Sequence, residues 1–409
     1  MTISPAPHRD RLLRLDHTAM RTHNLGLVLR AVRARPGVSR AEIAATTGLT
    51  KAAVGILVGE LMASSLITER EPAAHLRGRP AARLYIDGAH LLGLAVEVNL
   101  HGAGLLVRLT ARDLDGTEVF VGEMETVRHD VDSAVALVSD LVSRATELAV
   151  KTGRKLIGLE LAVPALVDKA GQVVINAPGL GWREVHLQQA LRESMPEVAL
   201  PIGINNLATY SAIAEAEDAY RDTGNLVHLE LGTGIGAGIV VDHQLLRGRA
   251  GVVGIIGHVQ LDPAGPTCTC GRTGCFEAFA GLSALLATAS GRCGRTLSRV
   301  EDVRAALLTS ELTAADLEPV SFAIGAGTAI LINLLGPDVL VLGGYMSDLA
   351  EWLLPPVVDI ARKRVLVPDL GGTRIDLSPF GHESVLLGAT SRIASRVLSD
   401  PTLVMNADL

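Results

Sequence analysis

Apolar positions in the first 86 residues repeat with helical spacing. The first stripe falls at i, i+3, i+4 and i+7, which predicts one buried face of a helix. Its members are Leu25, Val28, Leu29 and Val32. The pair Pro36-Gly37 ends this pattern. A second stripe predicts another helix that buries Val54, Leu57, Val58 and Leu61.

Capping residues mark the starts of two short helices in this region. Ser39 followed by Glu42 forms the pattern of a capping box, which predicts a helix through Ala45. The turn TTGLT contains Gly48, and Thr50 is placed to cap the next helix. Two short helices joined by a glycine-containing turn predict a helix-turn-helix.

The segments that follow predict a wing. LITER and ARLYID have strand composition and flank LRGRPA, in which Arg77-Gly78-Arg79-Pro80 is similar to an AT-hook tract that suits a narrow minor groove. Residues 1–86 are therefore expected to be a winged helix-turn-helix domain. The residues expected to contact DNA are Thr50, Lys51, Ala52, Gly55, Arg77 and Arg79.

From His90 onward, glycine-punctuated strands alternate with helices, which indicates an α/β body. The stretch LELGTGIGAGIVVD, residues 229–242, is an apolar strand interrupted by a glycine-rich turn. Glycines allow backbone N–H groups to close around an anion or another ligand. GLGW at 179–182 and INNLATYSAIAEA at 204–216 mark two further strand-to-loop transitions.

Composition and charge narrow the class of protein. No stretch of the 409 residues reaches 18 uninterrupted apolar residues, and the N-terminus lacks the apolar segment of a signal peptide. We therefore expect a cytoplasmic protein with no membrane partner. Residues 1–86 carry 13 Lys and Arg against 6 Asp and Glu, whereas the remainder carries 24 against 38. The basic module indicates a polyanionic partner, although a merely solvated basic face has the same charge.

Three of the four cysteines lie in CTCGRTGC, residues 268–275. Together with the upstream histidine they make a His-Cys₃ set that favours a structural Zn²⁺. Its members are His258, Cys268, Cys270 and Cys275. A disulfide across Cys-x-Cys would be strained, the spacing of a resolving pair is absent, and four protein ligands leave no open position for catalysis. Cys293 is interpreted as an ordinary buried or free thiol.

These motifs, in this order, resemble the ROK family of sugar kinases and sugar-responsive transcription factors. The resemblance rests on the winged helix-turn-helix, GTGIGAGIV and GH…CTCGRTGCFEAFAG, and it covers nearly the whole chain. It implies an actin-like (ribonuclease H-like) two-lobed α/β body preceded by an α+β domain. The expected first lobe is 87–206, completed by a C-terminal helix at 384–399, and the expected second lobe with the zinc site is 207–409.

Two departures from the family pattern argue against kinase activity. Where family kinases carry Asp-x-Gly-Gly-Thr-Lys to hold ATP phosphates, this chain has GLAVEVNL, with Glu97 in place of a glycine. The resemblance places Asn206 at the Asn of the family's Asn-Asp pair and Leu207 at the catalytic Asp. A leucine cannot accept a proton, and general-base assistance contributes typically about 10²–10⁴-fold. We therefore expect no enzymatic activity, and an active sugar kinase is the less favoured alternative.

The same comparison defines an expected effector site. The resemblance assigns it Gly179, Asn206, Ile255, His258 and Glu277. Ile255 replaces a family glutamate and Gly179 an asparagine, so two groups that bind sugar hydroxyls are lost. The leading effector class is a carbohydrate or sugar phosphate. A ligand-blind regulator, in which the body only oligomerises, is the alternative, and Asn206 and Glu277 would then be an ordinary cap and a helix-start carboxylate.

The sequence therefore predicts a cytoplasmic transcriptional repressor that binds double-stranded operator DNA. The resemblance implies a homodimer or homotetramer, whose two-fold symmetry would match a palindromic operator.

Overall fold

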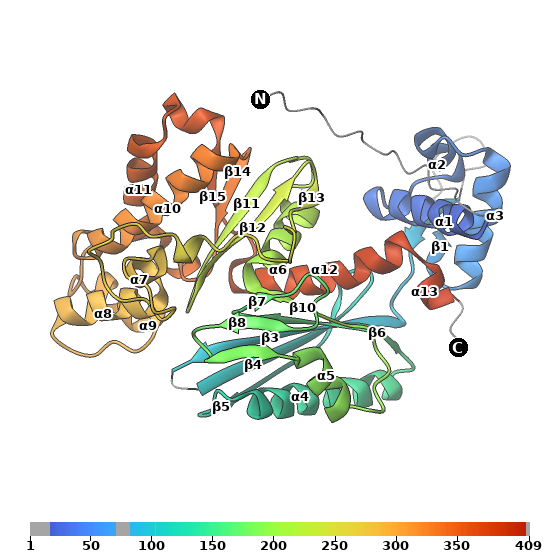
Figure 1. Cartoon of the computed structure of the whole chain (residues 1–409). Helices are drawn as coiled ribbons and strands as arrows, with labels where there is room; N and C mark the ends of the chain where they lie inside the picture. The colour runs from blue at the N-terminus through green and yellow to red at the C-terminus, as the bar shows by residue number, and fades with distance from the viewer. Residues whose placement is uncertain (1–16, 71–81, 103, 406–409) are drawn as a thin grey trace, which may run out of the picture. The chain divides into compact units, whose positions relative to one another are not determined.

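The computed structural model describes residues 17–70, 82–102 and 104–405 (Figure 1). The described residues of Met1–Gly88 and Ala394–Leu409 form one unit, and Ala89–Ile393 form the other. The helix α12, Ser384–Ser399, contributes its residues before Ala394 to the larger unit and the rest to the smaller one.

The smaller unit contains the expected helices and a pair of strands. These are α1 (His17–Ala34), α2 (Arg40–Thr47), α3 (Lys51–Ala63), β1 (Ile67–Arg70), β2 (Arg83–Ile86) and the short α13 (Thr402–Met405). Both predicted apolar stripes are buried in its core. The strands pair in antiparallel fashion, with Ile67 opposite Ile86. Gly26 of α1 is required because a Cβ there would lie 2.5 Å from the Ser399 carbonyl oxygen.

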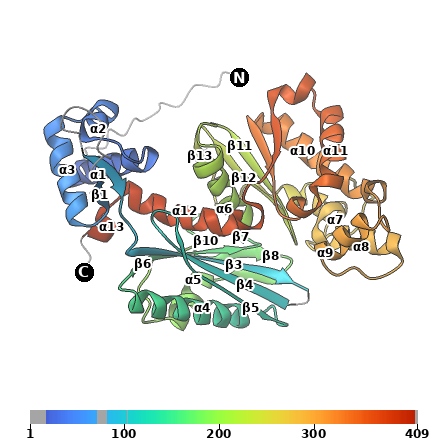
Figure 2. The ribbon, with the colours of Figure 1, turned by 180° about the vertical axis from the view of Figure 1, so that it is seen from behind.

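A five-stranded sheet in the order β10-β6-β3-β4-β5 forms the first lobe of the larger unit. Its strands are β3 (Leu91–His101), β4 (Gly104–Asp113), β5 (Glu118–Thr126), β6 (Lys155–Val163) and β10 (Ile202–Asn206). Helices α4 (Val131–Lys151) and α5 (Leu187–Ser194) cover one face, where they complete an apolar core (Figure 2). A small sheet of β7 (Leu166–Val167), β8 (Val174–Ala177) and β9 (Trp182–Val185) adjoins it.

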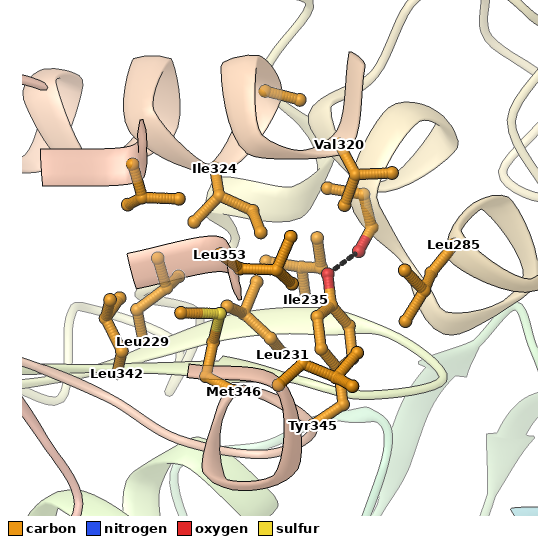
Figure 3. Packing of buried hydrophobic residues seen from close by; sticks show 14 of the residues in the cluster. Leu229, Leu231, Ile235, Leu285, Val320, Ile324, Leu342, Tyr345, Met346 and Leu353 are labelled. Atoms are coloured by element: carbon orange, nitrogen blue, oxygen red, sulfur yellow. Dashed lines mark hydrogen bonds between the residues drawn. The ribbon is translucent and has the colours of Figure 1, made fainter. Parts of the chain in front are cut away.

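The second lobe is built on another five-stranded sheet, in the order β13-β12-β11-β14-β15. Its strands are β11 (Leu226–Leu231), β12 (Ile235–Val241), β13 (Gln244–Leu245), β14 (Val339–Leu342) and β15 (Arg374–Leu377). Strand residues such as Leu229 and Leu342 pack against α10 (Glu318–Leu335) and α11 (Met346–Arg364), as Figure 3 shows. Within this core the Tyr345 hydroxyl donates to the Ala280 carbonyl at 2.5 Å.

The remaining elements connect these sheets. They are α6 (Leu207–Ala214), η1 (Glu215–Ala219), η2 (Ile256–His258), α7 (Phe276–Ala280), α8 (Leu282–Cys293), α9 (Val300–Leu308), η3 (Ala314–Leu317), η4 (Pro368–Gly372) and η5 (Gly381–Glu383). The run Ala314–Leu335 has the length and mean hydropathy, 1.5, of a membrane span, but 67% of it is buried inside the protein. It packs as a core helix.

The two large sheets repeat one topology. In each, three consecutive antiparallel strands are followed by two strands that add in parallel on the side of the first strand. β3, β4, β5, β6 and β10 thus correspond to β11, β12, β13, β14 and β15. This duplicated arrangement confirms the actin-like two-lobed α/β class predicted from the sequence.

Candidate functional sites

The helix-turn-helix is set by local capping interactions. Ser39 and Glu42 form a reciprocal capping box at the start of α2, as predicted. Gly48 ends α2 in the left-handed conformation with φ of 74°, which favours glycine. The Thr50 hydroxyl then caps α3 by accepting from the Ala53 N–H at 3.2 Å. The helix direction changes by 117° between α2 and α3, within the range found in helix-turn-helix motifs.

Beyond Lys51 at its first turn, the outward face of α3 has mostly small, apolar residues. Lys51, Ala52, Gly55, Ile56 and Gly59 are exposed on it, whereas the predicted inward positions are buried. A Cβ added at Gly55 or Gly59 would meet nothing within 4 Å, so internal packing does not require glycine there. Of the residues expected to contact DNA, Thr50 is engaged as a cap and the other three on α3 are exposed. Arg77 and Arg79 lie outside the described residues.

The His-Cys₃ set converges in space. The ligand atoms of His258, Cys268, Cys270 and Cys275 all lie within 4.8 Å of one another. Cys268 Sγ is 3.6 Å from His258 Nδ1, and Cys270 Sγ is 3.7 Å from Cys275 Sγ. Four ligands around a tetrahedral Zn²⁺ at about 2.0–2.3 Å are separated from one another by about 3.6–3.8 Å. The donor set and its geometry therefore fit zinc.

Glycines allow the cysteine loop to fold back on itself. Gly274 has φ of 68°, and a Cβ there would lie 1.5 Å from the Asp262 carbonyl oxygen. Gly271 has φ of 84° at the tip of the turn, where its N–H donates to the Cys268 carbonyl at 2.9 Å. The Cys268 N–H in turn donates to the Arg272 carbonyl at 2.7 Å. These bonds hold the loop in the conformation that brings the three thiols together.

The thiols differ in acidity from free cysteine. Burial raises the pKa of Cys275 to about 12, and hydrogen bonds with Cys270 and Cys268 raise it further in the same direction. Burial also raises the pKa of Cys268. Metal ligation requires thiolates, so binding of a cation must release protons from these two groups.

Glu277 joins the cysteine loop to the glycine-rich turn. Its Oε2 accepts from the Ile235 N–H at 3.0 Å, at the start of β12. Its Oε1 accepts from the Thr269 hydroxyl at 3.3 Å, and Cys268 Sγ lies 3.9 Å away. Since His258 Nδ1 faces Cys268, its other ring nitrogen points out of the cysteine set. His258 and Glu277 therefore belong to one contiguous group of side chains.

The other predicted effector residues are placed differently. Asn206 caps α6, with Oδ1 accepting from the Thr209 N–H at 2.8 Å, and it lies beside Gly236 of β12. Ile255 is half-buried and is the N-cap of η2, three residues before His258. Gly179 is exposed against Leu100, and no described contact joins it to the other four. Asn206 and Glu277 thus both lie against β12, and Ile255 and His258 follow Gly254, whose carbonyl accepts from the Ala237 N–H of that strand.

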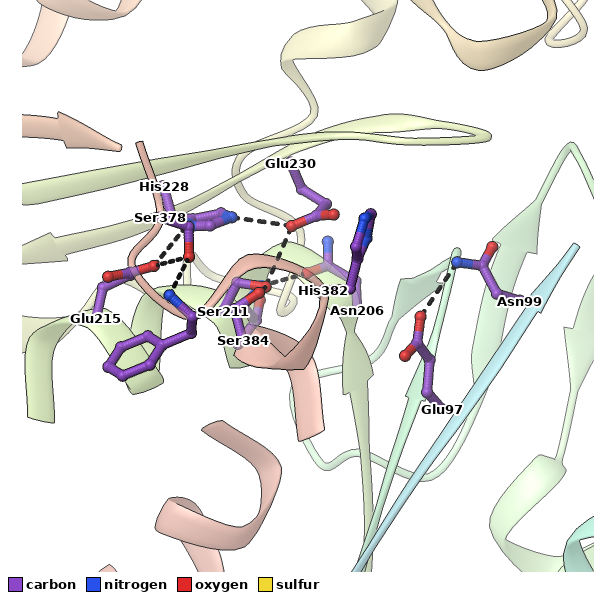
Figure 4. A network of polar contacts seen from close by, with 12 residues as sticks. Glu97, Asn99, Asn206, Ser211, Glu215, His228, Glu230, Ser378, His382 and Ser384 are labelled. Carbon is purple, nitrogen blue, oxygen red and sulfur yellow. Dashed lines mark hydrogen bonds and ion pairs between the residues drawn. The ribbon is translucent and has the colours of Figure 1, made fainter. Parts of the chain in front are cut away.

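A buried ion pair lies where the sequence departs from the phosphate-binding pattern. Glu97 is only 6% exposed, and its Oε2 accepts from Arg108 Nη2 at 2.6 Å. Arg108 also contacts Glu383 at 3.1 Å and the His382 carbonyl at 2.9 Å. Asn99 donates to Glu97 (Figure 4). It also accepts from the Thr233 hydroxyl of the glycine-rich turn at 3.1 Å. The Glu97 carboxylate is therefore matched by an internal cation.

A second buried polar network lies in the other lobe (Figure 4). His228 is fully buried, with Nε2 2.9 Å from Glu230 Oε2 and Nδ1 3.6 Å from Glu215 Oε1, the latter too long for a hydrogen bond. Burial disfavours the charged imidazole, but the two carboxylates outweigh it and raise the pKa of His228 to about 9. Ser378 donates to Glu215 at 2.6 Å. Gly343 is required because a Cβ would lie 2.5 Å from His228 Nε2.

Leu207 lies in an apolar environment. It is the first residue of α6 and packs in a cluster with Ala95, Tyr210 and Leu386. The position therefore offers neither a proton acceptor nor a polar setting for one.

Sequence reasoning missed the partners of Glu97 and the His228 network. Glu97 and Arg108 are directly opposite in the β3–β4 pairing. Both are equally distant from the turn at 101–104, so the hairpin register carried a signal for this pair. Glu230 lies two residues from His228 on β11, so both side chains are on one face of the strand and this spacing carried a signal. Glu215 belongs to another element, and no local spacing indicates its approach to His228.

Comparison with known proteins finds relatives both of the body and of the whole chain. The family model described as "ROK family" matches residues 103–395, more than half of the chain. A xylose repressor from Caldicellulosiruptor bescii is 26% identical over 404 residues, which covers 94% of this chain and 99% of the relative. A glucokinase from Halalkalibacterium halodurans is also 26% identical, but it covers only 71% of this chain and 92% of its own length.

A solved structure has the same fold along nearly the whole chain. It is described as a ROK family transcriptional regulator, homolog of E. coli MLC protein, and aligns with a TM-score of 0.78 at 24% identity. The alignment covers 94% of this chain and 98% of that one. The likeness therefore includes the N-terminal helical region as well as the two-lobed body.

Proposed function

The chain belongs to the ROK family, and we propose that it is a DNA-binding transcriptional repressor whose kinase-like body senses a small molecule. The observation that carries the proposal is the capped helix-turn-helix in front of a body of this family. Relatives named as repressors align along almost the entire chain, whereas the glucokinase aligns with a smaller share of it. A repressor of this kind acts in the cytoplasm.

We assign DNA contact to residues 1–86, with α3 in the major groove. Thr50, Lys51, Ala52 and Gly55 lie at the start and on the outer face of this helix. Arg77 and Arg79 are assigned to the minor groove on the sequence pattern alone. The body, taken as lobes 87–206 and 207–409, would supply the contacts of a homodimer or homotetramer. Two-fold symmetry would then require two half-sites in the operator.

The group around β12 is the proposed effector site. Asn206, His258 and Glu277 offer polar groups there, which supports a carbohydrate or sugar phosphate as the ligand class. Ile255 contributes an aliphatic side chain at the same place, and Gly179 offers no side chain to bind a hydroxyl. These two observations favour a second candidate function, a ligand-blind regulator whose body only oligomerises.

Zn²⁺ is the metal we assign to His258, Cys268, Cys270 and Cys275. Soft thiolates and one imidazole suit this ion, and four protein ligands leave no position for an activated water. A bound zinc would hold the cysteine loop in place beside Glu277, which contacts the glycine-rich turn. Its role in this proposal is structural.

Kinase activity is not part of the proposed function. Leu207 packs in an apolar cluster where family kinases have their base, and the Glu97 carboxylate is buried where those enzymes admit phosphate. A coupled ATP-turnover assay over a panel of hexoses tests this directly. We expect no turnover above the rate without protein, and sugar-dependent ADP release would contradict the assignment.

Selection of DNA from a random pool tests the repressor proposal. Full-length protein should enrich one sequence with two-fold symmetry, and that duplex placed over a promoter should reduce transcription in vitro. A thermal-shift screen of sugars, sugar phosphates and acidic metabolites then tests sensing. A saturable rise of several degrees supports an effector, whereas a blank screen supports the ligand-blind alternative. Failure to enrich any sequence would overturn DNA binding itself.

A further inference from the structure

The outward face of α3 carries one large apolar side chain, Ile56, which is 65% exposed. Its neighbours on this face are Ala52, Gly55 and Gly59, none of which extends beyond a methyl group. The opposite face of the helix is fully engaged in the core of the unit. Ile56 therefore makes no contribution to that core that would explain an isoleucine at this position.

Hydrogen-bonding side chains are scarce on the same face. Bidentate recognition of guanine or adenine needs Arg, Lys, Asn or Gln. Lys51, at the first turn, is the one such residue on the described α3 face. Glu60, on the flank of the helix, is paired with Arg21 at 2.8 Å. Direct readout by hydrogen bonds is thus restricted to the N-terminal end of the helix.

Lys51 on this face and the basic composition of residues 1–86 favour DNA as its occupant. Lys51 is exposed and forms no ion pair with any described residue. The first 86 residues have more than twice as many Lys and Arg as Asp and Glu. Such a surface attracts phosphates, while an apolar side chain projecting from a recognition helix can contact the one apolar group in the major groove, the C5-methyl of thymine.

On the premise that the helix-turn-helix binds operator DNA, we propose that Ile56 determines sequence specificity by packing against thymine methyl groups in the major groove. Gly55 and Gly59 have no side chains and therefore leave space on either side of Ile56. Packing within the protein does not require glycine at these positions, since an added Cβ would meet nothing within 4 Å. The half-site under α3 should consequently contain thymines at fixed positions. Thymine is distinguished there by its methyl group and not by a hydrogen bond.

Replacement of thymine by deoxyuridine tests the proposal, because it removes only the methyl group. The duplex enriched from the random pool is synthesised with deoxyuridine at one thymine at a time, and Kd is measured by fluorescence anisotropy. One or two positions per half-site should weaken binding about fourfold, the factor for one buried methyl. With Ile56→Ala, the thymine and deoxyuridine duplexes should bind equally well.

Leu403→Ala is the matched control, since Leu403 is another aliphatic residue of this unit and is 53% exposed on α13. This variant should keep the wild-type preference for thymine. Circular dichroism melting checks that both variants are folded. If DNA binds specifically but tolerates deoxyuridine everywhere, the role of Ile56 is wrong and the proposed function stands. If no sequence is enriched, the proposed function fails. A change in oligomer size on Ile56→Ala, with discrimination unchanged, would instead assign the face to a protein contact.

Discussion

Arg108 supplies the cation that pairs with a buried carboxylate. It lies between Glu97 of β3 and Glu383 of η5, directly before α12, and its own side chain is largely buried. A carboxylate in an apolar interior is costly unless a cation matches it. The burial of the Glu97 carboxylate therefore depends on the charge of Arg108, and the burial of Arg108 depends on that of Glu97.

Arg108→Ala should destabilise the larger unit by about 3–5 kcal/mol, because it leaves the Glu97 carboxylate buried without a cation. The free energy of unfolding in urea measures this. The matched control is Arg144→Ala, which removes an exposed pair with Asp140 on α4 and should cost below about 1 kcal/mol. Adding Glu97→Gln to Arg108→Ala should recover part of the loss. Equal effects of the two arginine substitutions would show that Glu97 does not depend on its partner.

His228 gives the stability a predicted pH dependence. Its pKa is about 9 in the folded protein and about 6.5 in an unfolded chain. Since the folded pKa is raised, the stabilisation is fully present below pH about 6.5 and is lost as the pH rises through about 9. The free energy of unfolding, measured in urea at pH 6, 7.5 and 9, should decline with rising pH in the wild-type protein. The decline should be smaller in His228→Asn. Parallel pH profiles for the two proteins would contradict the assignment.

At the scale of elements, local patterns were sufficient where the interactions themselves are local. The capping box of α2, the Thr50 cap and the buried face of α3 could be predicted because each depends on residues within a few positions. The convergence of the cysteines followed from one short loop and a histidine ten residues upstream. The approach of Glu215 to His228, and the bond from Ser378 to Glu215, could not be predicted, since these residues meet only when separate elements pack together. Glu230 is a local neighbour of His228 on β11.

The cysteine loop should bind one zinc ion per chain. Removal of zinc by a chelator, or by Cys268→Ala with Cys270→Ala, should lower the melting temperature and weaken any effector response, because the loop then no longer holds Glu277 against β12. Mass spectrometry measures the metal content. Thermal melts with and without the effector measure the melting temperature and the effector response. Cys293→Ala is the control, as Cys293 lies outside the set, and it should retain zinc. A double variant with full stability and full effector response would refute the structural role.

Substitution of Gly274 tests whether the fold of the cysteine loop is required for zinc binding when all four ligands are kept. Gly274→Ala should abolish zinc binding, because the new Cβ would overlap the Asp262 carbonyl oxygen and displace the loop. Gly271→Ala is the matched control, because it has a positive φ but no atom within 4 Å of the new Cβ. It should cost about 1 kcal/mol and keep the ion. Comparable zinc loss in both variants would mean that backbone conformation alone controls the loop.

At the scale of the whole molecule, the fold alone does not determine the function. The duplicated sheets place the chain among two-lobed actin-like proteins, which include kinases and regulators of this family. The helix-turn-helix and the apolar setting of Leu207 distinguish between these classes. We propose on these grounds that the smaller unit binds specific DNA and that the body does not perform phosphoryl transfer.

Salt-dependent DNA binding tests this claim most directly. Fluorescence anisotropy of the enriched duplex and a shuffled duplex is measured with full-length protein at several salt concentrations, for wild type and Lys51→Ala. Wild type should prefer the enriched duplex by at least about 10³-fold. Lys51→Ala should weaken binding to both duplexes and reduce the slope of log Kd against log salt by about one. Equal affinity of wild type for the two duplexes at every salt concentration would contradict the account.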